Sequence, residues 1–206
     1  MRQHGTFLKE FAVGGEQTDD VISWMRTLPL FLEYPGFRVV HACWNEDIID
    51  MLRMEAPAGI LYEEQFIRAA KKQEKLYNLV EVTTKGPEIA LPNGFSFKDK
   101  DGTVRSEVRL QWWNGAANTW PELAISVPDE EELPKTEVPP DVLSEVYSIS
   151  AKPVFFGHYW LSGVPVLQAH NALCLDYSAG KDGPLVSYQM DGKPTGLTLN
   201  KLSVHA

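Results

Sequence analysis

The sequence changes character at Lys85-Gly86-Pro87, and this change restricts the possible folds more than any other feature of the chain. Before it, most apolar residues recur at intervals of three and four, which is typical of amphipathic helices. After it, short apolar runs and alternating residues stand between turn residues, which is typical of strands. Helices followed mostly by strands predict an α+β or layered sandwich architecture.

Helices are expected in three places before the change, over residues 21–28, 46–54 and 63–81. The first follows Thr18 and Asp19, either of which is a suitable N-cap because its side-chain oxygen can accept a backbone N–H. Asn45 is the expected N-cap of the second helix.

Strand signals surround this helical part. Pro35-Gly36 separates two apolar runs and predicts a hairpin-like turn, and residues 37–40 form the strand that follows it. Residues 88–97 and 103–113 flank an Asp-Gly turn, which is a strong hairpin signal. Further short strands are expected within residues 153–160, 164–178 and 184–192.

Residues 127–141 differ from both patterns, because they are acidic and contain four prolines. This composition predicts an exposed loop without a packed core of its own. No internal repeat divides the chain, and its 206 residues are enough for one sizeable domain with a hydrophobic core. We therefore expect residues 1–206 to form a single domain.

The bulk composition excludes several classes of function. The net charge of −9 argues against general attraction to nucleic acid or anionic membranes. No apolar run is long enough to span a bilayer, and the first residues lack the pattern of a secretory signal. The two cysteines, Cys43 and Cys174, are too few for a disulfide scaffold. A reduced, cytoplasmic protein is expected.

Two histidines occupy similar places at the ends of predicted strands. His41 ends RVVHACW, and His158 ends the apolar run of PVFFGHYW. Side chains at strand ends face the crevice in which open α/β sheets bind ligands, and neutral imidazole is a common metal ligand. A single buried histidine is nevertheless more often a hydrogen-bonded core residue. Spacing alone leaves both interpretations open.

Other residues offer weaker signals for binding. Arg105 and Arg109 lie on one face of a predicted strand and could grip a phosphate, although exposed arginines on a sheet are common. Trp112 and Trp113 follow, and at most one of them could stack on a nucleotide base because neighbours in a strand point to opposite faces.

Several segments, in order along the chain, together resemble the C-terminal part of bacterial calcineurin-like metallophosphoesterases of the phosphoprotein-phosphatase type. This group includes bacterial serine/threonine phosphatases and diadenosine tetraphosphatase-like hydrolases. The resemblance extends from about residue 7 to residue 200 and rests on RVVHACW (38–44), KGPEIALPNGFSFKDKDGTVR (85–105), RLQWW (109–113), PVFFGHYWLSG (153–163) and CLDYSAGKDGPLVSYQMDG (174–192).

The resemblance implies the C-terminal portion of a layered α/β/β/α sandwich that hydrolyses phosphate esters with two divalent metal ions, manganese, iron or zinc. By position, it implies that His41 and His158 are ligands of the same metal. Asp176 and Tyr159 would support these ligands, with Asp176 in hydrogen-bond contact with a ligand histidine. A turn or capping role for Asp176 is an equal alternative.

The sequence also departs from this family. Gly-Asp-x-His-Gly, Gly-Asp-x-x-Asp-Arg-Gly and Gly-Asn-His-Glu, which supply the remaining ligands, are absent. Trp160 stands where many metallophosphoesterases have a second histidine, as in the phosphoprotein-phosphatase branch, so the ligands of the other metal must come from elsewhere. The chain is thus expected to be a partial domain that binds metal weakly or not at all and is inactive alone. The missing half would be supplied in cis or by a separate chain. The alternative is a non-enzymatic binding or interaction module that retains the second sheet of the fold.

Overall fold

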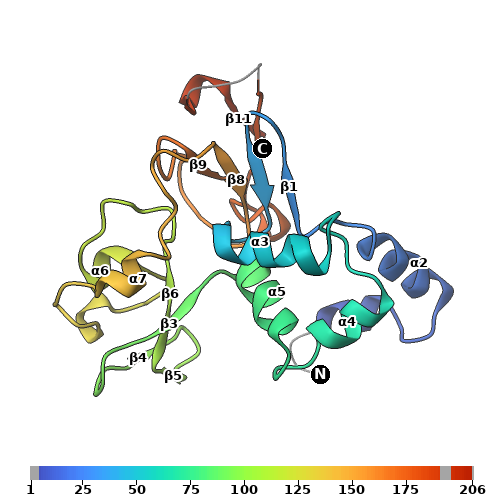
Figure 1. Ribbon diagram of the computed structural model, residues 1–206, viewed down its shortest axis with the longest axis horizontal. Coiled ribbons are helices and arrows are strands. Elements are labelled where there is room, and N and C mark those ends of the chain that lie inside the picture. Colours follow the sequence, from blue (N-terminus) through green and yellow to red (C-terminus); the bar gives the residue numbers. More distant parts are fainter. Residues whose placement is uncertain (1–4, 191–195, 206) are drawn as a thin grey trace.

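The computed structural model describes residues 5–190 and 196–205. Within these ranges the chain forms a mixed α+β fold with seven α-helices and several small sheets (Figure 1). The expected fold class is therefore confirmed at this level. No helix in the described ranges is long and apolar enough to cross a membrane.

A four-stranded sheet forms the centre of the molecule, in the order β1-β2-β8-β9. Strand β1 (Phe31–Glu33) pairs antiparallel with β2 (Arg38–Val40), and the expected Pro35-Gly36 turn joins them. Strand β8 (Val154–Phe156) pairs parallel with β2 on one side and with β9 (Ala172–Cys174) on the other. Three parallel strands therefore end at the same edge of the sheet.

Both faces of this sheet are covered, as the alternation of side chains requires. Val40, Val154 and Phe156 belong to the largest core cluster, which also contains buried residues of helices α3 (Glu46–Glu55) and α5 (Lys75–Lys85). Val39 and Phe155 point to the opposite face and pack in a cluster with residues of β10 (Leu185–Tyr188) and β11 (Leu202–His205). Figure 1 shows α3 and α5 beneath the sheet and the β11 end of the chain above it.

A second lobe contains the long hairpin expected after Pro87. Strand β3 (Glu88–Ala90) pairs with β6 (Glu107–Leu110), and β4 (Phe97–Lys98) pairs with β5 (Val104–Arg105) further out. The remaining elements of this lobe are β7 (Ala124–Ile125), α6 (Trp120–Leu123) and α7 (Pro140–Leu143). Figure 1 shows the lobe beside the central sheet, with helices α2 and α4 on the other side.

Residues 127–141 belong to this second lobe. They are mostly exposed and include a 3₁₀ turn at Glu130–Glu132, but Leu133 and Val138 are 1% and 4% exposed and join the lobe's hydrophobic cluster. The segment is therefore anchored to a core that it shares with the strands of the hairpin.

The N-terminal helices begin elsewhere than the sequence predicts. Helix α1 (Gly5–Glu10) precedes α2 (Glu16–Met25), whose N-cap is Gly15. Thr18 lies within α2, and its hydroxyl donates to the carbonyl of Ala12 at 2.6 Å. The prediction of Thr18 or Asp19 as N-cap was wrong, whereas Asn45 does cap α3 by accepting from the amide of Ile48 at 3.1 Å.

The single helix expected over residues 63–81 is two helices, α4 (Glu63–Ala69) and α5. They are separated around residues 71–74, whose sequence is Lys-Lys-Gln-Glu. These residues provide no apolar side chain for more than one turn of helix, so a continuous helix would have no buried face there. The strand expected within 184–192 ends at Tyr188, and Asp191 and Gly192 lie outside the described residues.

Candidate functional site

The two strand-end histidines lie together at the carboxyl edge of the central sheet. His41 directly follows β2, and His158 comes two residues after β8, its parallel neighbour. Their ring centroids are 5.4 Å apart and their planes are inclined by 62°. The amide of Gly157 donates to the carbonyl of His41 at 2.9 Å and ties the two strand ends together. The fold therefore places two imidazoles, from residues distant in sequence, next to each other.

Asp176 comes from the end of β9, the third parallel strand, and joins the same edge. Its Oδ2 accepts from the amide of Trp160 at 3.3 Å, and its Oδ1 accepts from the amide of Ser178 at 3.0 Å. Its own carbonyl accepts from the amide of Leu161 at 3.0 Å. Within the described ranges the carboxylate makes no hydrogen bond to either imidazole, so the expected contact with a ligand histidine is not formed. Asp176 instead fixes the loops after β8 and β9, as in the capping alternative.

The environment favours neutral imidazoles. Burial lowers the pKa of His158 to about 4, and the positive charge of Arg109 and the neighbouring His41 act in the same direction. His41 is more exposed, but the desolvation that it undergoes also lowers its pKa, while the charge of Asp176 opposes this. Neither ring donates or accepts a hydrogen bond with another residue in the described ranges. Neutral imidazoles without internal partners are free to bind a metal ion or an external ligand.

The two candidate arginines differ in their relation to this pair. Arg109 lies on β6, where its Nη2 pairs with Glu88 Oε1 at 2.6 Å and its charge acts on His158. Its Nε is buried and has no hydrogen-bond partner among the described residues. Arg105 lies on the separate β5 and pairs with Asp99 through Nη2 at 2.8 Å. The two arginines therefore do not form a joint phosphate grip, since only Arg109 acts on the histidine pair.

Tyr159 lies beneath the histidine pair. It is 8% exposed, and its hydroxyl accepts from the indole Nε1 of Trp112 at 2.9 Å. Burial raises the pKa of this phenol well above its usual range. The rings of Tyr159 and His158 meet edge to face with centroids 5.6 Å apart, without the hydrogen bond that a direct support would make. Tyr159 therefore supports the site by packing.

Trp112 and Trp113 are core residues. They are 0% and 4% exposed, and both pack against Phe156 of β8. A nucleotide base has no access to either ring, so the suggestion that one of them stacks on a base was wrong. Both tryptophans are buried because the second lobe packs against the central sheet. The alternation of side chains within one strand does not predict such a contact.

Strained backbone gathers in the two loops that border the histidine pair. Of the described residues other than glycine, five have positive φ: His158, Trp160, Ser178, Asp182 and Ser126. The first four lie in the loops after β8 and β9. Left-handed backbone at such residues costs about 1–3 kcal/mol each and persists where surrounding structure enforces it, often at binding sites. These conformations could not be predicted from the sequence, because none of these positions is a glycine.

A pocket of about 310 Å³ opens between α5 and the β3–β6 pair. Lys85, Gly86 and Glu88 line it, and the charge of Lys85 contributes to the low pKa of His158. Gly86 also packs closely against Tyr159, because a Cβ at this position would lie 2.4 Å from the Tyr159 hydroxyl oxygen. The pocket itself is mainly acidic, because Glu81, Glu88 and Glu107 also line it, and Lys85 pairs with Glu81 at 2.7 Å.

The donor set fits part of a metal centre. Two neutral imidazoles on adjacent strands are suitable ligands for manganese, iron or zinc. In the ranges 5–190 and 196–205, however, no three histidine, cysteine, aspartate or glutamate side chains are grouped so that they could hold a metal ion. His41 and His158 therefore need ligands beyond those gathered by the described residues.

Comparison of the chain with protein-family models, with curated proteins and with solved structures finds no match.

Proposed function

We propose that this chain is the C-terminal segment of a metal-dependent phosphoesterase of the calcineurin-like type, with His41 and His158 as ligands of one metal ion. The observation that carries the proposal is the meeting of the two imidazoles, 5.4 Å apart between ring centroids, at the ends of adjacent parallel strands. Burial lowers the pKa of both imidazoles, which favours their neutral form, and neither has a hydrogen-bond partner within the described ranges.

The architecture supports the same assignment. A central sheet with α3 and α5 on one face and the β10–β11 hairpin on the other is compatible with part of a layered α/β/β/α sandwich. Figure 1 is consistent with such layers, with a helical layer below the central sheet. We infer that the rest of the sandwich comes from a segment in cis or from a separate chain.

When bound, two metal ions would activate a water molecule and neutralise charge on the phosphoryl group. The residues of this chain would prepare the site for that chemistry. His41 and His158 would hold the metal. Arg109 and Lys85, which pair with Glu88 and Glu81, both lower the pKa of His158 and so favour its neutral, metal-binding form. Asp176 holds the two loops in place through the amides of Trp160 and Ser178.

The chain alone is expected to bind Mn²⁺ weakly, because two imidazoles balance none of the cation's charge and complete only part of its coordination. Weak binding is measurable by NMR, since substoichiometric Mn²⁺ broadens the signals of nearby protons. We expect broadening of the imidazole signals of His41 and His158. His170 and His205 are exposed histidines outside the pair and should remain sharp, so they provide an internal control.

Variants make the test specific to the pair. His41→Ala should remove the broadening at His158, and His158→Ala should remove it at His41, whereas His170→Ala should change neither. Equal broadening of all the histidines, or none at the pair, would contradict the proposal. The latter result with a cooperatively folded protein would favour the non-enzymatic binding module.

The same proposal predicts the catalytic behaviour of the isolated chain. With Mn²⁺ and p-nitrophenyl phosphate it should show no useful turnover, because the ligands that would hold the second metal are not gathered among the described residues. Robust turnover that His158→Ala abolishes would show that this chain contains a complete centre, and would overturn the assignment of a partial one.

A further inference from the structure

Six tryptophans fall into two groups by exposure. Four are at most 4% exposed, namely Trp44, Trp112, Trp113 and Trp120. Trp24 and Trp160 are 60% and 54% exposed. Trp24 lies on α2, whereas Trp160 lies two residues after His158 at the carboxyl edge of the central sheet. A large aromatic ring left in solvent next to a candidate site offers a face on which a planar ligand can stack.

The main chain holds Trp160 firmly despite its exposure. Its φ is +50°, and its amide donates to Asp176 Oδ2 at 3.3 Å. On either side, Tyr159 is buried, and the amide of Leu161 donates to the carbonyl of Asp176 at 3.0 Å. These contacts maintain a left-handed conformation that a tryptophan rarely adopts. The indole is therefore presented to solvent by a fixed backbone, which reduces the entropic cost of binding a ligand to it.

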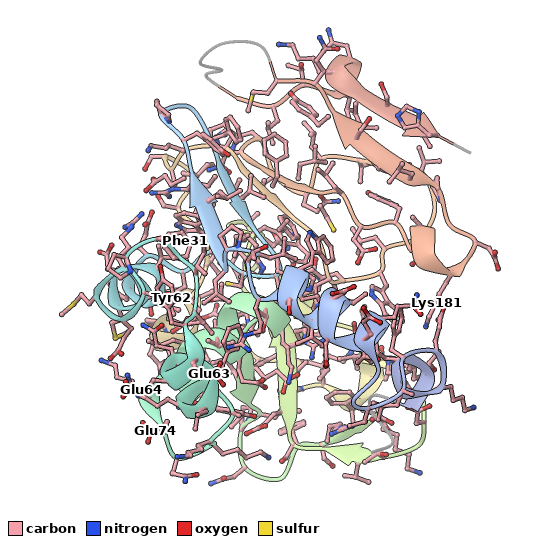
Figure 2. All side chains as sticks on the ribbon, turned by 90° about the vertical axis from the view of Figure 1, so that its right-hand side faces the viewer. Phe31, Tyr62, Glu63, Glu64, Glu74 and Lys181 are labelled. Atoms are coloured by element: carbon pink, nitrogen blue, oxygen red, sulfur yellow. The ribbon has the colours of Figure 1, made fainter. Side chains whose placement is uncertain are left out.

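A cation lies against the indole. Lys181 Nζ is 3.7 Å from the centroid of the Trp160 ring. Lys181 makes no ion pair with any residue in the ranges 5–190 and 196–205. Figure 2 shows it at the margin of the molecule, away from the acidic side chains of Glu63, Glu64 and Glu74. An exposed cation–π contact is worth only about 0.5–1 kcal/mol, so a ligand can displace the ammonium group or bind beside it.

The geometry points to a binding site for a planar, anionic ligand, in which the Trp160 indole stacks on an aromatic group and Lys181 pairs with a negative charge. This inference rests on the proposed phosphoesterase function and specifies its substrate class as phosphate esters with a planar aromatic group. Nucleoside monophosphates and aryl phosphates share this chemistry. Sugar phosphates and alkyl phosphates offer no face for the indole.

Binding can be measured by tryptophan fluorescence in a Trp24→Phe background, where Trp160 is the one remaining tryptophan exposed among the described residues. The probes are AMP, phenyl phosphate and ribose 5-phosphate. AMP, phenyl phosphate or both should bind more tightly than ribose 5-phosphate and quench the fluorescence of Trp160. The two aromatic probes distinguish a nucleobase from a simple aryl group.

Variants of the two residues separate their roles. By calorimetry, Trp160→Ala should raise the Kd of the better aromatic probe roughly ten-fold, as expected for the loss of one stacking contact. Trp160→Phe should retain part of the affinity. Lys181→Met should weaken AMP but leave neutral adenosine unchanged. Trp24→Ala, the matched change at an exposed tryptophan on α2, should have no effect.

The inference is overturned if no aromatic probe binds better than ribose 5-phosphate, or if Trp160→Ala leaves the affinity unchanged in a protein with an unaltered circular dichroism spectrum. Its failure is distinguishable from failure of the proposed function. Mn²⁺ broadening at His41 and His158 without aromatic selectivity sinks this inference alone. If aromatic probes bind through Trp160 but Mn²⁺ does not broaden the signals of His41 and His158, the ligand class is supported and the proposed metal-dependent function is contradicted.

Discussion

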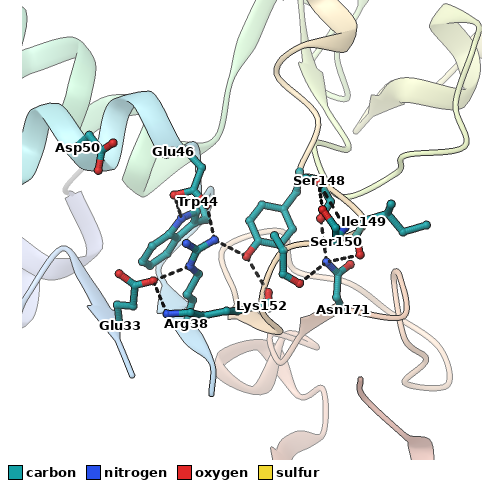
Figure 3. A network of polar contacts seen from close by, with 12 residues as sticks. Glu33, Arg38, Trp44, Glu46, Asp50, Ser148, Ile149, Ser150, Lys152 and Asn171 are labelled. Carbon is teal, nitrogen blue, oxygen red and sulfur yellow. Dashed lines mark hydrogen bonds and ion pairs between the residues drawn. The ribbon is translucent and has the colours of Figure 1, made fainter. Parts of the chain in front are cut away.

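Arg38 begins strand β2 and His41 follows its last residue, yet the two side chains are held very differently. Arg38 is 8% exposed, its Nε donates to Glu33 Oε1 at 3.0 Å, and its Nη1 donates to the Tyr147 hydroxyl at 2.9 Å. It also pairs with Glu46 and lies over the ring of Trp44. Figure 3 shows the guanidinium between Glu33, Glu46 and the Trp44 ring.

This network extends into the loop before β8. The Tyr147 hydroxyl donates to the carbonyl of Lys152 at 2.7 Å, and Asn171 Nδ2 donates to the carbonyls of Ser148 and Ala151 at 2.9 and 3.0 Å. At the other end of the strand, neither imidazole of the histidine pair has a hydrogen-bond partner in the described ranges. A satisfied polar group stabilises the fold, whereas an unsatisfied one at a strand end remains available to a ligand.

The largest effect is expected for Arg38→Met, which should lower the free energy of unfolding by about 3 kcal/mol. The change leaves Glu33 and Tyr147 without their buried partner, while partial exposure of the carboxylates keeps the cost at the lower end of the usual range. Urea unfolding should show a lower midpoint with an unchanged slope.

Arg105→Met is the matched control for this variant, since it removes an arginine from the exposed pair with Asp99. An exposed pair contributes at most about 1 kcal/mol, so this variant should unfold close to the wild type. If the two variants lost equal stability, the contrast between a buried network and surface pairs would not hold.

The next effect concerns the support beneath the histidine pair. Gly86→Ala should destabilise the protein by roughly 2–3 kcal/mol, because its φ is +87° and the new Cβ would lie 2.4 Å from the Tyr159 hydroxyl oxygen. Gly102→Ala is the control, since its φ is +77° but a Cβ there meets no described atom within 4 Å. It should cost only the backbone strain, about 1 kcal/mol. Equal losses for both, measured by urea unfolding, would mean that Tyr159 moves aside freely.

The two ends of β2 should also respond to different ranges of pH. Because the pKa of His158 is about 4 in the folded protein and 6.5 in the unfolded chain, only the unfolded state binds a proton between these values. Stability should therefore fall as the pH decreases from 6.5 to 4, by about 2 kcal/mol after allowance for partial exposure. His158→Gln should remove this part of the dependence, as measured by urea unfolding at a series of pH values.

Glu33, at the Arg38 end, acts in the same direction but over a lower range of pH. Burial alone would raise its pKa, but hydrogen bonds from Lys152 and Arg38 lower it overall from its ordinary value of 4.5. Its contribution to stability is therefore present above pH 4.5 and is lost as the pH falls through its folded pKa. Arg38→Met should change the curve below pH 4.5, and His158→Gln should change it above pH 4. If both variants changed the stability curve over the same range of pH, the assignment of separate ranges to Glu33 and His158 would be wrong.

Features governed by local chemistry could be predicted from the sequence. The Pro35-Gly36 turn, the Asn45 cap and the Asp-Gly hairpin depend on residues within a few positions, and all three are confirmed. The position of His41 after a strand followed from the same local pattern. The division of residues 63–81 into α4 and α5 has a local cause as well, the polar residues 71–74, but the helical spacing of apolar residues on either side hid it.

The site itself was only partly accessible, because it is built from long-range contacts. The sequence placed both histidines at strand ends, but the parallel pairing of β2 and β8 brings their rings together. The local sequence did not distinguish the buried Trp112 from the exposed Trp160, because the exposure of each ring depends on how elements distant in sequence pack around it. Likewise, the positive φ values of His158 and Trp160 arise from loop contacts to Asp176 and its neighbours.

The smallest expected effect tests which charges surround the histidine pair. After burial, Arg109 contributes most to the low pKa of His158, and His41 contributes next. Arg109→Gln should therefore raise the pKa of His158 more than His41→Gln does, and Arg105→Gln should leave it unchanged because Arg105 lies on another strand pair. NMR titration of the imidazole signals measures these shifts.

His41→Gln should change the free energy of unfolding by less than about 0.5 kcal/mol, because no hydrogen bond of its ring is lost. A larger shift in the pKa of His158 for Arg105→Gln than for Arg109→Gln would contradict the prediction that Arg109 is the charge that acts on His158. The expected order would support Arg109 as the charge that acts most on His158, although the stability of this end of β2 barely depends on His41.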